Sequence, residues 1–396
     1  MNFETPSTLR LSCGLGQRDM LASELEQLSV ATQPGGPTGV ECHGTLLDAM
    51  RLNVLSRVAM RVLYRLDSFL CTTPDELSAG VAAVPWEDIV PLNGYLSVTC
   101  TVDHPTIDNS MFASLTVKDA IVDRIRGIFS RRPDSGPDRT GTVIHLHWSG
   151  DTAQLWIDTS GQKLADRGYR KMPHLAPLRE TLAAAMLLRA GYTGETPLVI
   201  PRCGSGTLAI EGALIAAGRP PGLLRSAFGF QHLIGFNKEV WADMRRTLSP
   251  PKPRRGGPSC PPIIASDINS TAVEATRRNA ETAGVGHLIE THVCDFADTP
   301  LPQETGHLIL HPEYGLRLGD SDALQSLYPR MGDFLKQQCG GWSSWIFTGN
   351  PDLAKRIGLR PACRVPMRNA TVDARLLGFD VWEGRREGDE HRSASA

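Results

Sequence analysis

The residues best suited to chemistry form a glycine-rich turn, Cys203-Gly-Ser-Gly-Thr207, between a short apolar run and an alanine-rich helical pattern. Glycine reaches left-handed backbone conformations and lets a ligand come close to the chain, so Gly204 and Gly206 suit a tight loop over a bound molecule. The helix that begins there offers unpaired N–H groups, which favour a carboxylate or a phosphate. The turn alone is equally compatible with a bare connection between a strand and a helix.

Three later strand ends support a binding site. Asp267 closes the apolar run Ile263–Asp267, and an acid at this place in an open α/β sheet usually binds a ribose. Asp295 closes another short run, and a third run leads into His311-Pro-Glu-Tyr314. Because ligands of such sheets bind outside the carboxyl ends of the strands, the sequence predicts a nucleoside site along that edge.

The elements that must position this site follow from the hydrophobic pattern. Short apolar runs alternate with helical patterns in the second half of the chain, which predicts an α/β fold with a doubly wound sheet. The front half mixes alternating strands with amphipathic helices, which predicts a separate α+β region. In that half we expect helices over 17–28 and 110–129, and strands over 95–102, 142–148 and 152–158.

Composition limits the class of protein. The net charge of −2 gives no global basic signature, so contacts with nucleic acid must come from local patches. Nine scattered cysteines without a Cys-x-x-Cys pair argue against disulfides and zinc, and they fit a reducing cytoplasm. His145 and His147 share a strand face, but no further ligands cluster nearby, so we expect no metal. We also expect no signal peptide and no membrane span.

A basic segment between the two halves is a candidate RNA contact. Four cations surround one aromatic residue here: Lys163, Arg167, Arg170 and Lys171 around Tyr169. Cations interleaved with an aromatic ring suit phosphates and a stacked base, and an ordinary charged linker is the alternative. Residues 228–262 form a second basic stretch, which we expect to be a mobile loop with Arg245, Arg246, Lys252, Arg254 and Arg255.

These blocks resemble class I S-adenosylmethionine-dependent methyltransferases. They are most similar to RNA methyltransferases with an N-terminal THUMP domain, notably the 23S rRNA guanine-N2 methyltransferases. The segment Pro201–Thr207 matches the family's first motif, Asp-Pro-x-Cys-Gly-Ser-Gly-Thr, and an Arg-Gly-Tyr-Arg segment similar to 167–170 is also present in the family. Over nearly the whole chain, the resemblance implies a ferredoxin-like and THUMP region that holds RNA (1–160), a basic linker (161–180), a Rossmann-like methyltransferase domain (181–387) and a disordered tail (388–396).

The resemblance also implies roles for single residues. Cys203, Gly204, Gly206 and Thr207 would approach S-adenosylmethionine, Asp267 would bind its ribose and Asp295 its adenine amine. His311, Pro312 and Tyr314 occupy the family's Asn/Asp-Pro-Pro-Tyr motif, in which the first side chain and the proline carbonyl accept hydrogen bonds from the amine of a flipped base and the aromatic stacks on it. The expected function is methylation of the exocyclic N2 amine of guanine in ribosomal RNA, with the large subunit as the partner.

Three residues depart from the family pattern. His311 replaces the amide or acid, Glu313 replaces the second proline, and Ile200 replaces an acid that helps to hold the methionine end of the cofactor. A neutral histidine can accept one hydrogen bond, whereas a protonated one only donates, and Glu313 could itself accept from the amine. The alternative is therefore a catalytically inactive RNA-binding relative that keeps the fold. A nicotinamide dehydrogenase fits poorly, because Asp267 follows Gly206 by about sixty residues instead of about twenty.

Overall fold

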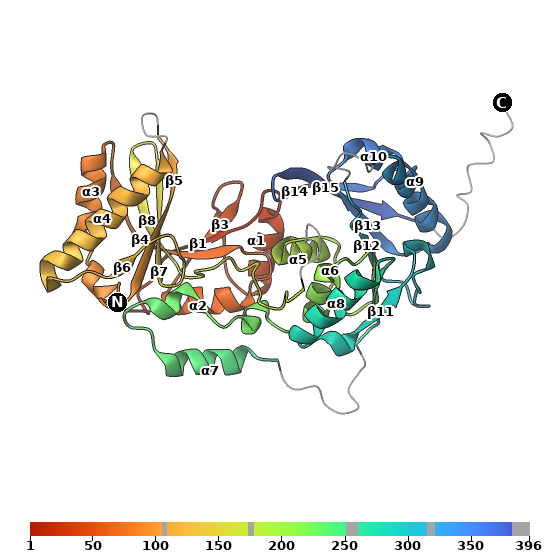
Figure 1. Ribbon diagram of the computed structural model, residues 1–396, viewed down its shortest axis with the longest axis horizontal. Coiled ribbons are helices and arrows are strands. Elements are labelled where there is room, and N and C mark those ends of the chain that lie inside the picture. The colour runs from red at the N-terminus through yellow and green to blue at the C-terminus, as the bar shows by residue number, and fades with distance from the viewer. Residues whose placement is uncertain (105–108, 173–177, 251–259, 315–320, 382–396) are drawn as a thin grey trace. The chain divides into compact units, whose positions relative to one another are not determined.

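The computed structural model describes residues 1–104, 109–172, 178–250, 260–314 and 321–381, without the side chains of 321–323. In this part of the chain there are two compact units, and each is built on one β-sheet (Figure 1). The first unit comprises residues 1–13, 21–167 and 220–249, and the second comprises 14–20, 168–219 and 250–396. Residues 220–249 thus belong to the first unit, although the expected boundaries placed them in the methyltransferase domain. The expected tail, 388–396, lies outside the described residues.

The first unit contains one mixed sheet, which joins the two parts expected to be ferredoxin-like and THUMP regions. The strand order is β2-β3-β1-β4-β8-β7-β5-β6, and β4 pairs with both β1 and β8 in antiparallel fashion. The two parts therefore share one continuous sheet. Its strands are β1 (Ser7–Ser12), β2 (Gln33–Pro34), β3 (Gly39–Gly44), β4 (Arg61–Leu70), β5 (Tyr95–Asp103), β6 (Asp134–Ser135), β7 (Thr142–Ser149) and β8 (Thr152–Asp158).

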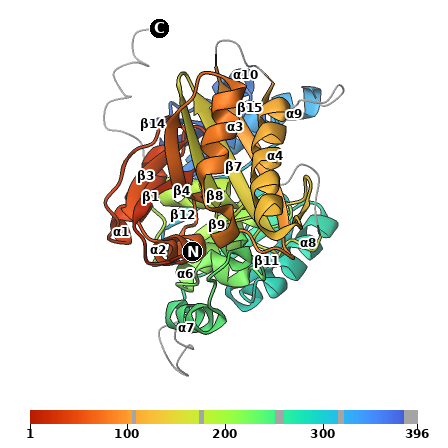
Figure 2. The same ribbon diagram turned by 90° about the vertical axis from the view of Figure 1, so that its left-hand side faces the viewer.

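The helices of this unit begin where the sequence provides caps. In α2 (Leu46–Leu55) and α3 (Pro74–Ala83), a threonine cap and an acid three residues later form capping boxes, Thr45 with Asp48 and Thr73 with Glu76. Helix α4 (Ser110–Phe129) spans the predicted range and lies beside α3 and over β5 (Figure 2). Helix α1 covers Arg18–Gln27, as its amphipathic pattern predicts.

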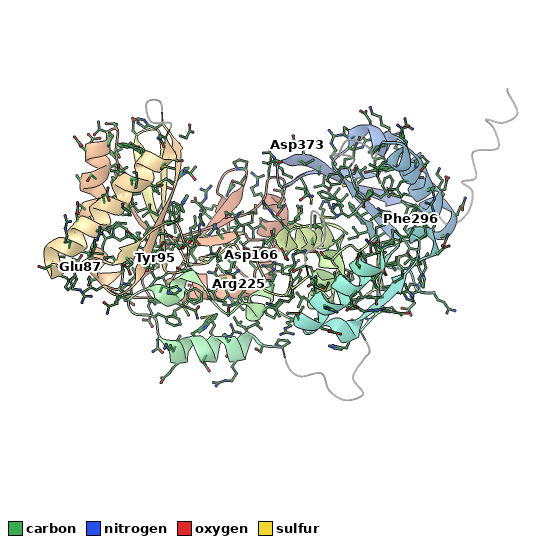
Figure 3. The ribbon with its side chains drawn as sticks, viewed as in Figure 1. Glu87, Tyr95, Asp166, Arg225, Phe296 and Asp373 are labelled. Carbon is green, nitrogen blue, oxygen red and sulfur yellow. The ribbon has the colours of Figure 1, made fainter. Side chains whose placement is uncertain are left out.

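The stretch 220–249 differs from the mobile loop that we expected. Helix α7 (Lys238–Leu248) occupies its end, with Asn237 as the cap and with Arg245 and Arg246 in the last turn. Proline-rich neighbours hid this short helix in the sequence. The buried guanidinium of Arg225 donates to five backbone carbonyls, among them that of Asp166 at 2.8 Å, and so fixes the stretch to its own unit (Figure 3). Lys252, Arg254 and Arg255 lie outside the described residues.

The second unit is a Rossmann-like α/β domain. Its strand order is β11-β10-β9-β12-β13-β15-β14; β9 to β13 are parallel, and β15 and β14 are antiparallel. Successive strands run outward in one direction from β9 and in the other from β12, so the topological switch point lies between them. The strands are β9 (Leu198–Pro201), β10 (Ile263–Asp267), β11 (Ile289–Val293), β12 (His307–Leu310), β13 (Ser343–Thr348), β14 (Cys363–Asn369) and β15 (Val372–Asp380).

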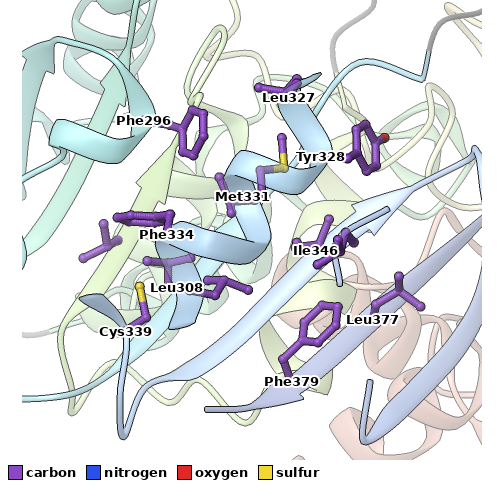
Figure 4. Packing of buried hydrophobic residues seen from close by; sticks show 14 of the residues in the cluster. Phe296, Leu308, Leu327, Tyr328, Met331, Phe334, Cys339, Ile346, Leu377 and Phe379 are labelled. Atoms are coloured by element: carbon purple, nitrogen blue, oxygen red, sulfur yellow. The ribbon is translucent and has the colours of Figure 1, made fainter. Parts of the chain in front are cut away.

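One core holds the carboxyl half of this domain together. Helix α9 (Ser321–Gln338) places Tyr328, Met331 and Phe334 against Leu308 of β12 and Ile346 of β13 (Figure 4). The remaining helices are α5 (Glu180–Arg189), α6 (Thr207–Ala216), α8 (Ser270–Thr282) and α10 (Pro351–Lys355). None of the helices in the described ranges is both long enough and apolar enough to cross a membrane.

Candidate active site

The glycine turn connects β9 to α6 in a conformation that needs glycine. Gly206 is the cap of α6 with φ 85°, and an added Cβ would lie 2.7 Å from the Cγ2 atom of Thr276. Gly204 also has a positive φ, 57°, but no heavy atom of the described residues lies within 4 Å of its virtual Cβ. Thr276 donates through its hydroxyl to the Gly204 carbonyl at 3.0 Å. The turn therefore has no room for a side chain at Gly206, whereas the space beside Gly204 is open.

Asp267 lies beside this turn, as the sequence predicts. Its Oδ2 atom accepts from the Gly204 N–H at 3.1 Å, and its Oδ1 atom accepts from the Asn269 N–H at 3.0 Å. A carboxylate has about four lone-pair positions, so both oxygens can still accept from a ribose. The structure therefore brings the glycine turn and the second strand end together at one edge of the sheet.

The third strand end carries Asp295, which is already partly engaged. Its Oδ1 atom accepts from the Ala297 N–H at 3.0 Å and contacts Arg330 at 2.8 Å. Two apolar side chains that the sequence analysis missed lie beside the acids: Ile268, which is 66% exposed, and Val293, which is 55% exposed and pairs in register with Asp267. Exposed apolar residues next to a strand-ending acid suit the flat face of a base. Their position directly after or opposite that acid is the signal that could have identified them.

The turn after β12 contains a hydrogen bond between two predicted catalytic residues. The Nε2 atom of His311 lies 2.8 Å from the hydroxyl oxygen of Tyr314, to which Asn369 also donates at 3.4 Å. Burial, aided by the charge of Arg202, lowers the pKa of His311 to about 4 despite the opposing effect of Glu313. The ring is therefore neutral at physiological pH, and its Nε2 atom is committed to Tyr314.

The ring of Tyr314, which was expected to stack on a base, is mostly covered by other residues of the protein. Its side chain is buried at 8% exposure, and burial raises the pKa of its hydroxyl. Its ring packs edge-on against His311 and Phe347, and its backbone carbonyl accepts from Asn350 at 3.0 Å. Pro312 is buried as well. Little of the Tyr314 ring is thus open to a base in this conformation.

Glu313, one of the three departures from the family pattern, pairs with Arg202 across the switch point. Arg202, directly after β9, has the unusual φ of 61° for a residue with a side chain, and its guanidinium contacts the Glu313 carboxylate. Ile200 is 1% exposed and pairs in register with Ala265, so it belongs to the core of the sheet. Ile200 therefore does not block the carboxyl edge of the sheet. Glu313 does not block it either, because its side chain is 65% exposed.

Cys203 and Thr207 support the turn from inside the fold. Both are buried, and the Cys203 thiol lies 3.4 Å from the hydroxyl of Thr276. Burial raises the pKa of Cys203 to about 12, so it is a neutral thiol and no nucleophile. Any contact of these two residues with a ligand must therefore come from their backbones.

The basic segment differs from our expectation, because three of its five predicted RNA-binding residues act inside the protein. Arg167 and Tyr169 are each 1% exposed; Arg167 donates to the Leu164 carbonyl at 2.7 Å, and Tyr169 donates to Glu211 at 3.2 Å. Arg170 pairs with the buried Glu180 at 2.6 Å and donates to the Ser205 hydroxyl at 3.0 Å. The cations that sequence reasoning assigned to phosphates thus anchor the linker and the glycine turn. Lys163 and Lys171 are exposed and stay candidates for RNA contact.

A metal site is a separate question. His145 contacts the hydroxyl groups of Thr99 and Thr101, at 2.9 and 3.4 Å, and burial lowers its pKa to about 4. Across the described ranges, no three metal-ligating side chains of histidine, cysteine, aspartate or glutamate come together.

A mostly parallel sheet with this switch point, a glycine turn and acidic strand ends defines a nucleoside-binding α/β domain of the methyltransferase kind. A family model described as RMKL-like, methyltransferase domain, matches residues 167–377, and models of the RlmL ferredoxin-like domain and the THUMP domain match 8–63 and 71–158. The chain belongs to this RMKL-like methyltransferase family, with both accessory domains ahead of the catalytic one.

Named relatives match most of this chain. Ribosomal RNA large subunit methyltransferase K/L of Syntrophotalea carbinolica is 40% identical over 380 residues, which cover 93% of this chain and 53% of that protein. A Synechocystis protein described as a candidate RNA methyltransferase is 33% identical and is matched over 95% of its length and 93% of this chain. A crystal structure of a candidate methyltransferase complexed with SAH has a TM-score of 0.84 at 26% identity, covering 96% of this chain and all of the other. The chain spans about half the length of the K/L relatives that it matches.

Proposed function

We propose that this chain transfers a methyl group from S-adenosylmethionine to the exocyclic N2 amine of a guanine in ribosomal RNA of the large subunit. The observation that carries the proposal is the meeting of the Gly204 turn, Asp267 and the His311–Tyr314 turn at the carboxyl ends of β9, β10 and β12. Ligands of open α/β sheets bind at this edge. The names of the K/L relatives support the choice of ribosomal RNA, and the SAH bound to the structural neighbour supports the choice of cofactor.

The residues at this edge fit such a cofactor. The open space before Gly204 lets a ligand approach the backbone, the free lone pairs of Asp267 suit ribose hydroxyls, and Ile268 offers an apolar surface to adenine. Asp295 can accept from the adenine amine while it remains paired with Arg330. When bound, the cofactor supplies an electrophilic methyl group on a sulfonium. The protein then has to hold a base so that its amine faces that methyl group. Hydrogen-bond acceptors on the protein can hold and orient the amine in this way.

The front unit supports a nucleic-acid substrate. A ferredoxin-like domain and a THUMP domain share the sheet of this unit. The exposed Lys163 lies near residue 167, where the main segment of the first unit ends. We propose the limits 1–160, 161–180 and 181–387 for the RNA-binding region, the linker and the methyltransferase domain, with residues 220–249 returning to the first unit. An exposed lysine can bind a phosphate without any rearrangement of the fold.

Transfer of a labelled methyl group to unmodified large-subunit ribosomal RNA tests the proposal. Digestion of the RNA to nucleosides should reveal N2-methylguanosine at one position, and Tyr314→Ala should abolish the label. Label on N6 of adenine would overturn the choice of base. RNA binding without any transfer at saturating cofactor would favour the inactive relative.

A further inference from the structure

We propose that Glu313, oriented by Arg202, supplies the side-chain hydrogen-bond acceptor for the amine of the substrate base. Glu313 would then be a catalytic residue, and Arg202 a positioning residue. The inference rests on the proposed function, since it names the group that meets the amine.

An exocyclic amine on an aromatic ring is a poor nucleophile, because its lone pair is delocalised into the ring. Acceptors placed on its N–H groups hold the nitrogen where that lone pair can reach the methyl group, and they stabilise the positive charge that develops on it. A carboxylate makes shorter and stronger hydrogen bonds than a neutral acceptor. The site therefore needs an acceptor side chain beside the carbonyl of Pro312.

His311 does not offer that acceptor in this structure. Asn369 donates to the hydroxyl oxygen of Tyr314, and we assign the hydroxyl hydrogen to the contact with His311 Nε2, 2.8 Å away. The proton of the neutral ring then lies on Nδ1, which can only donate. Both ring nitrogens are thus unsuited to accept from a substrate amine.

Glu313 has the placement that His311 lacks. Its backbone carbonyl accepts from the hydroxyl of the fully buried Tyr328 at 3.2 Å, which fixes the turn, while its side chain is 65% exposed. Arg202 contacts Oε2 of this carboxylate from the end of β9. We assign the other oxygen, Oε1, to the amine. The pair lies at the carboxyl ends of β9 and β12, where the proposed base would enter.

The strain at Arg202 supports a functional role for the pair. Arg202 has a left-handed φ of 61°, which is unfavourable for a residue with a side chain. Backbone strain of this kind persists where the surrounding structure imposes it, and it concentrates at functional sites. An exposed ion pair alone adds little to stability, so stabilisation of the fold does not explain the arrangement.

The step balances with Glu313 as the acceptor. The nitrogen–carbon bond forms as the methyl–sulfur bond breaks, the sulfonium becomes a neutral thioether, and the amine releases one proton. The hydrogen bond from that N–H to the carboxylate gives the proton a path to Glu313 and from there to water.

Steady-state methyl transfer to ribosomal RNA, which yields kcat, tests this assignment. Glu313→Ala should lower kcat by about 100-fold, and Glu313→Gln, which keeps an oxygen acceptor, by only about tenfold. Cofactor affinity and thermal unfolding should stay unchanged in both. Arg202→Gln should lower kcat less than Glu313→Ala does. The double variant Arg202→Gln/Glu313→Ala should have the same kcat as Glu313→Ala alone, because Arg202 acts through Glu313.

A second-site variant separates this assignment from the proposed function. His311→Asn should restore about tenfold or more of the activity lost in Glu313→Ala, because the asparagine oxygen replaces the missing acceptor. A kcat of Glu313→Ala within about twofold of the wild-type value would overturn the assignment. The assignment would also fail if His311→Asn did not rescue Glu313→Ala while the variant His311→Asn/Glu313→Pro was active. If both the wild type and His311→Asn/Glu313→Pro fail to transfer methyl, the proposed function itself fails, and the role of Glu313 falls with it.

Discussion

The hydroxyl of Tyr314 and the Nε2 atom of His311 lie 2.8 Å apart, so the first and last residues of the proposed catalytic turn bind each other. The contact closes the turn at the end of β12 and leaves Glu313 between them on the outside. Replacement of the family's amide or acid by histidine therefore changes more than one hydrogen-bonding group. It ties the aromatic residue to the strand end.

Removal of the Tyr314 hydroxyl tests this contact. Tyr314→Phe should lower the free energy of unfolding by about 1–2 kcal/mol, because the half-buried polar groups of His311 and Asn369 lose their partner. Methyl transfer should fall by less than about tenfold, since the ring remains. Denaturant unfolding checks the first value, and Tyr95→Phe in the front unit is the control. Equal stability of Tyr314→Phe and the wild type would show that the contact does not form in solution.

The lowered pKa of His311 predicts a pH dependence of stability. The unfolded chain binds the proton near 6.5 and the folded chain only at about 4, so protonation favours unfolding. The contribution is complete above pH 6.5 and is lost as the pH falls toward 4, with a total of about 3 kcal/mol. Four other histidines also have a lowered pKa and act in the same direction: His145, His147, His232 and His307. The measurement is therefore the difference between wild type and His311→Asn. A difference that does not change between pH 7 and 4 would contradict the lowered pKa and the neutral state of the ring.

The two glycines of the turn should respond differently to alanine. Gly206→Ala places a Cβ 2.7 Å from Thr276 and should destabilise the domain by about 2 kcal/mol or more, because backbone and packing both resist it. Gly204→Ala meets open space and should cost about 1 kcal/mol of stability from its positive φ alone. Its added methyl would point toward the proposed ligand, so cofactor affinity should fall by about tenfold or more. Unchanged affinity in Gly204→Ala would place the cofactor elsewhere.

The revised RNA contact can be tested by salt dependence. Lys163→Ala/Lys171→Ala should weaken RNA binding and reduce the slope of log Kd against log salt by about one for each lost phosphate contact. Stability should not change, because both side chains are exposed. Arg167→Ala should instead destabilise the protein, since its guanidinium is buried on backbone carbonyls. A salt slope that stays the same in the double lysine variant would exclude these residues from the RNA interface.

The sequence predicted the fold better than it predicted the positions of single side chains. Strand ends, glycine turns and helix caps are local signals, and they located β9, β10 and β12 and placed Gly204 and Asp267 at the same edge of the sheet. The burial of Arg167 and Tyr169 depends on tertiary structure. The local sequence of a basic segment does not show whether its cations contact carbonyl oxygens or solvent. Helix α7 was missed because the prolines that follow it in the sequence favoured a loop, although Asn237 provides a cap. The pairing of Arg202 with Glu313 joins residues 111 positions apart, and no local pattern reports it.

Calorimetric titration with S-adenosylhomocysteine tests the central claim most directly. We predict micromolar binding at one site, weakened by about 10- to 100-fold in Asp267→Ala, which loses its charged hydrogen bonds to the ribose and to the glycine turn. No binding to the wild type at millimolar ligand, or the same affinity in Asp267→Ala, would contradict a cofactor site at the carboxyl edge of this sheet.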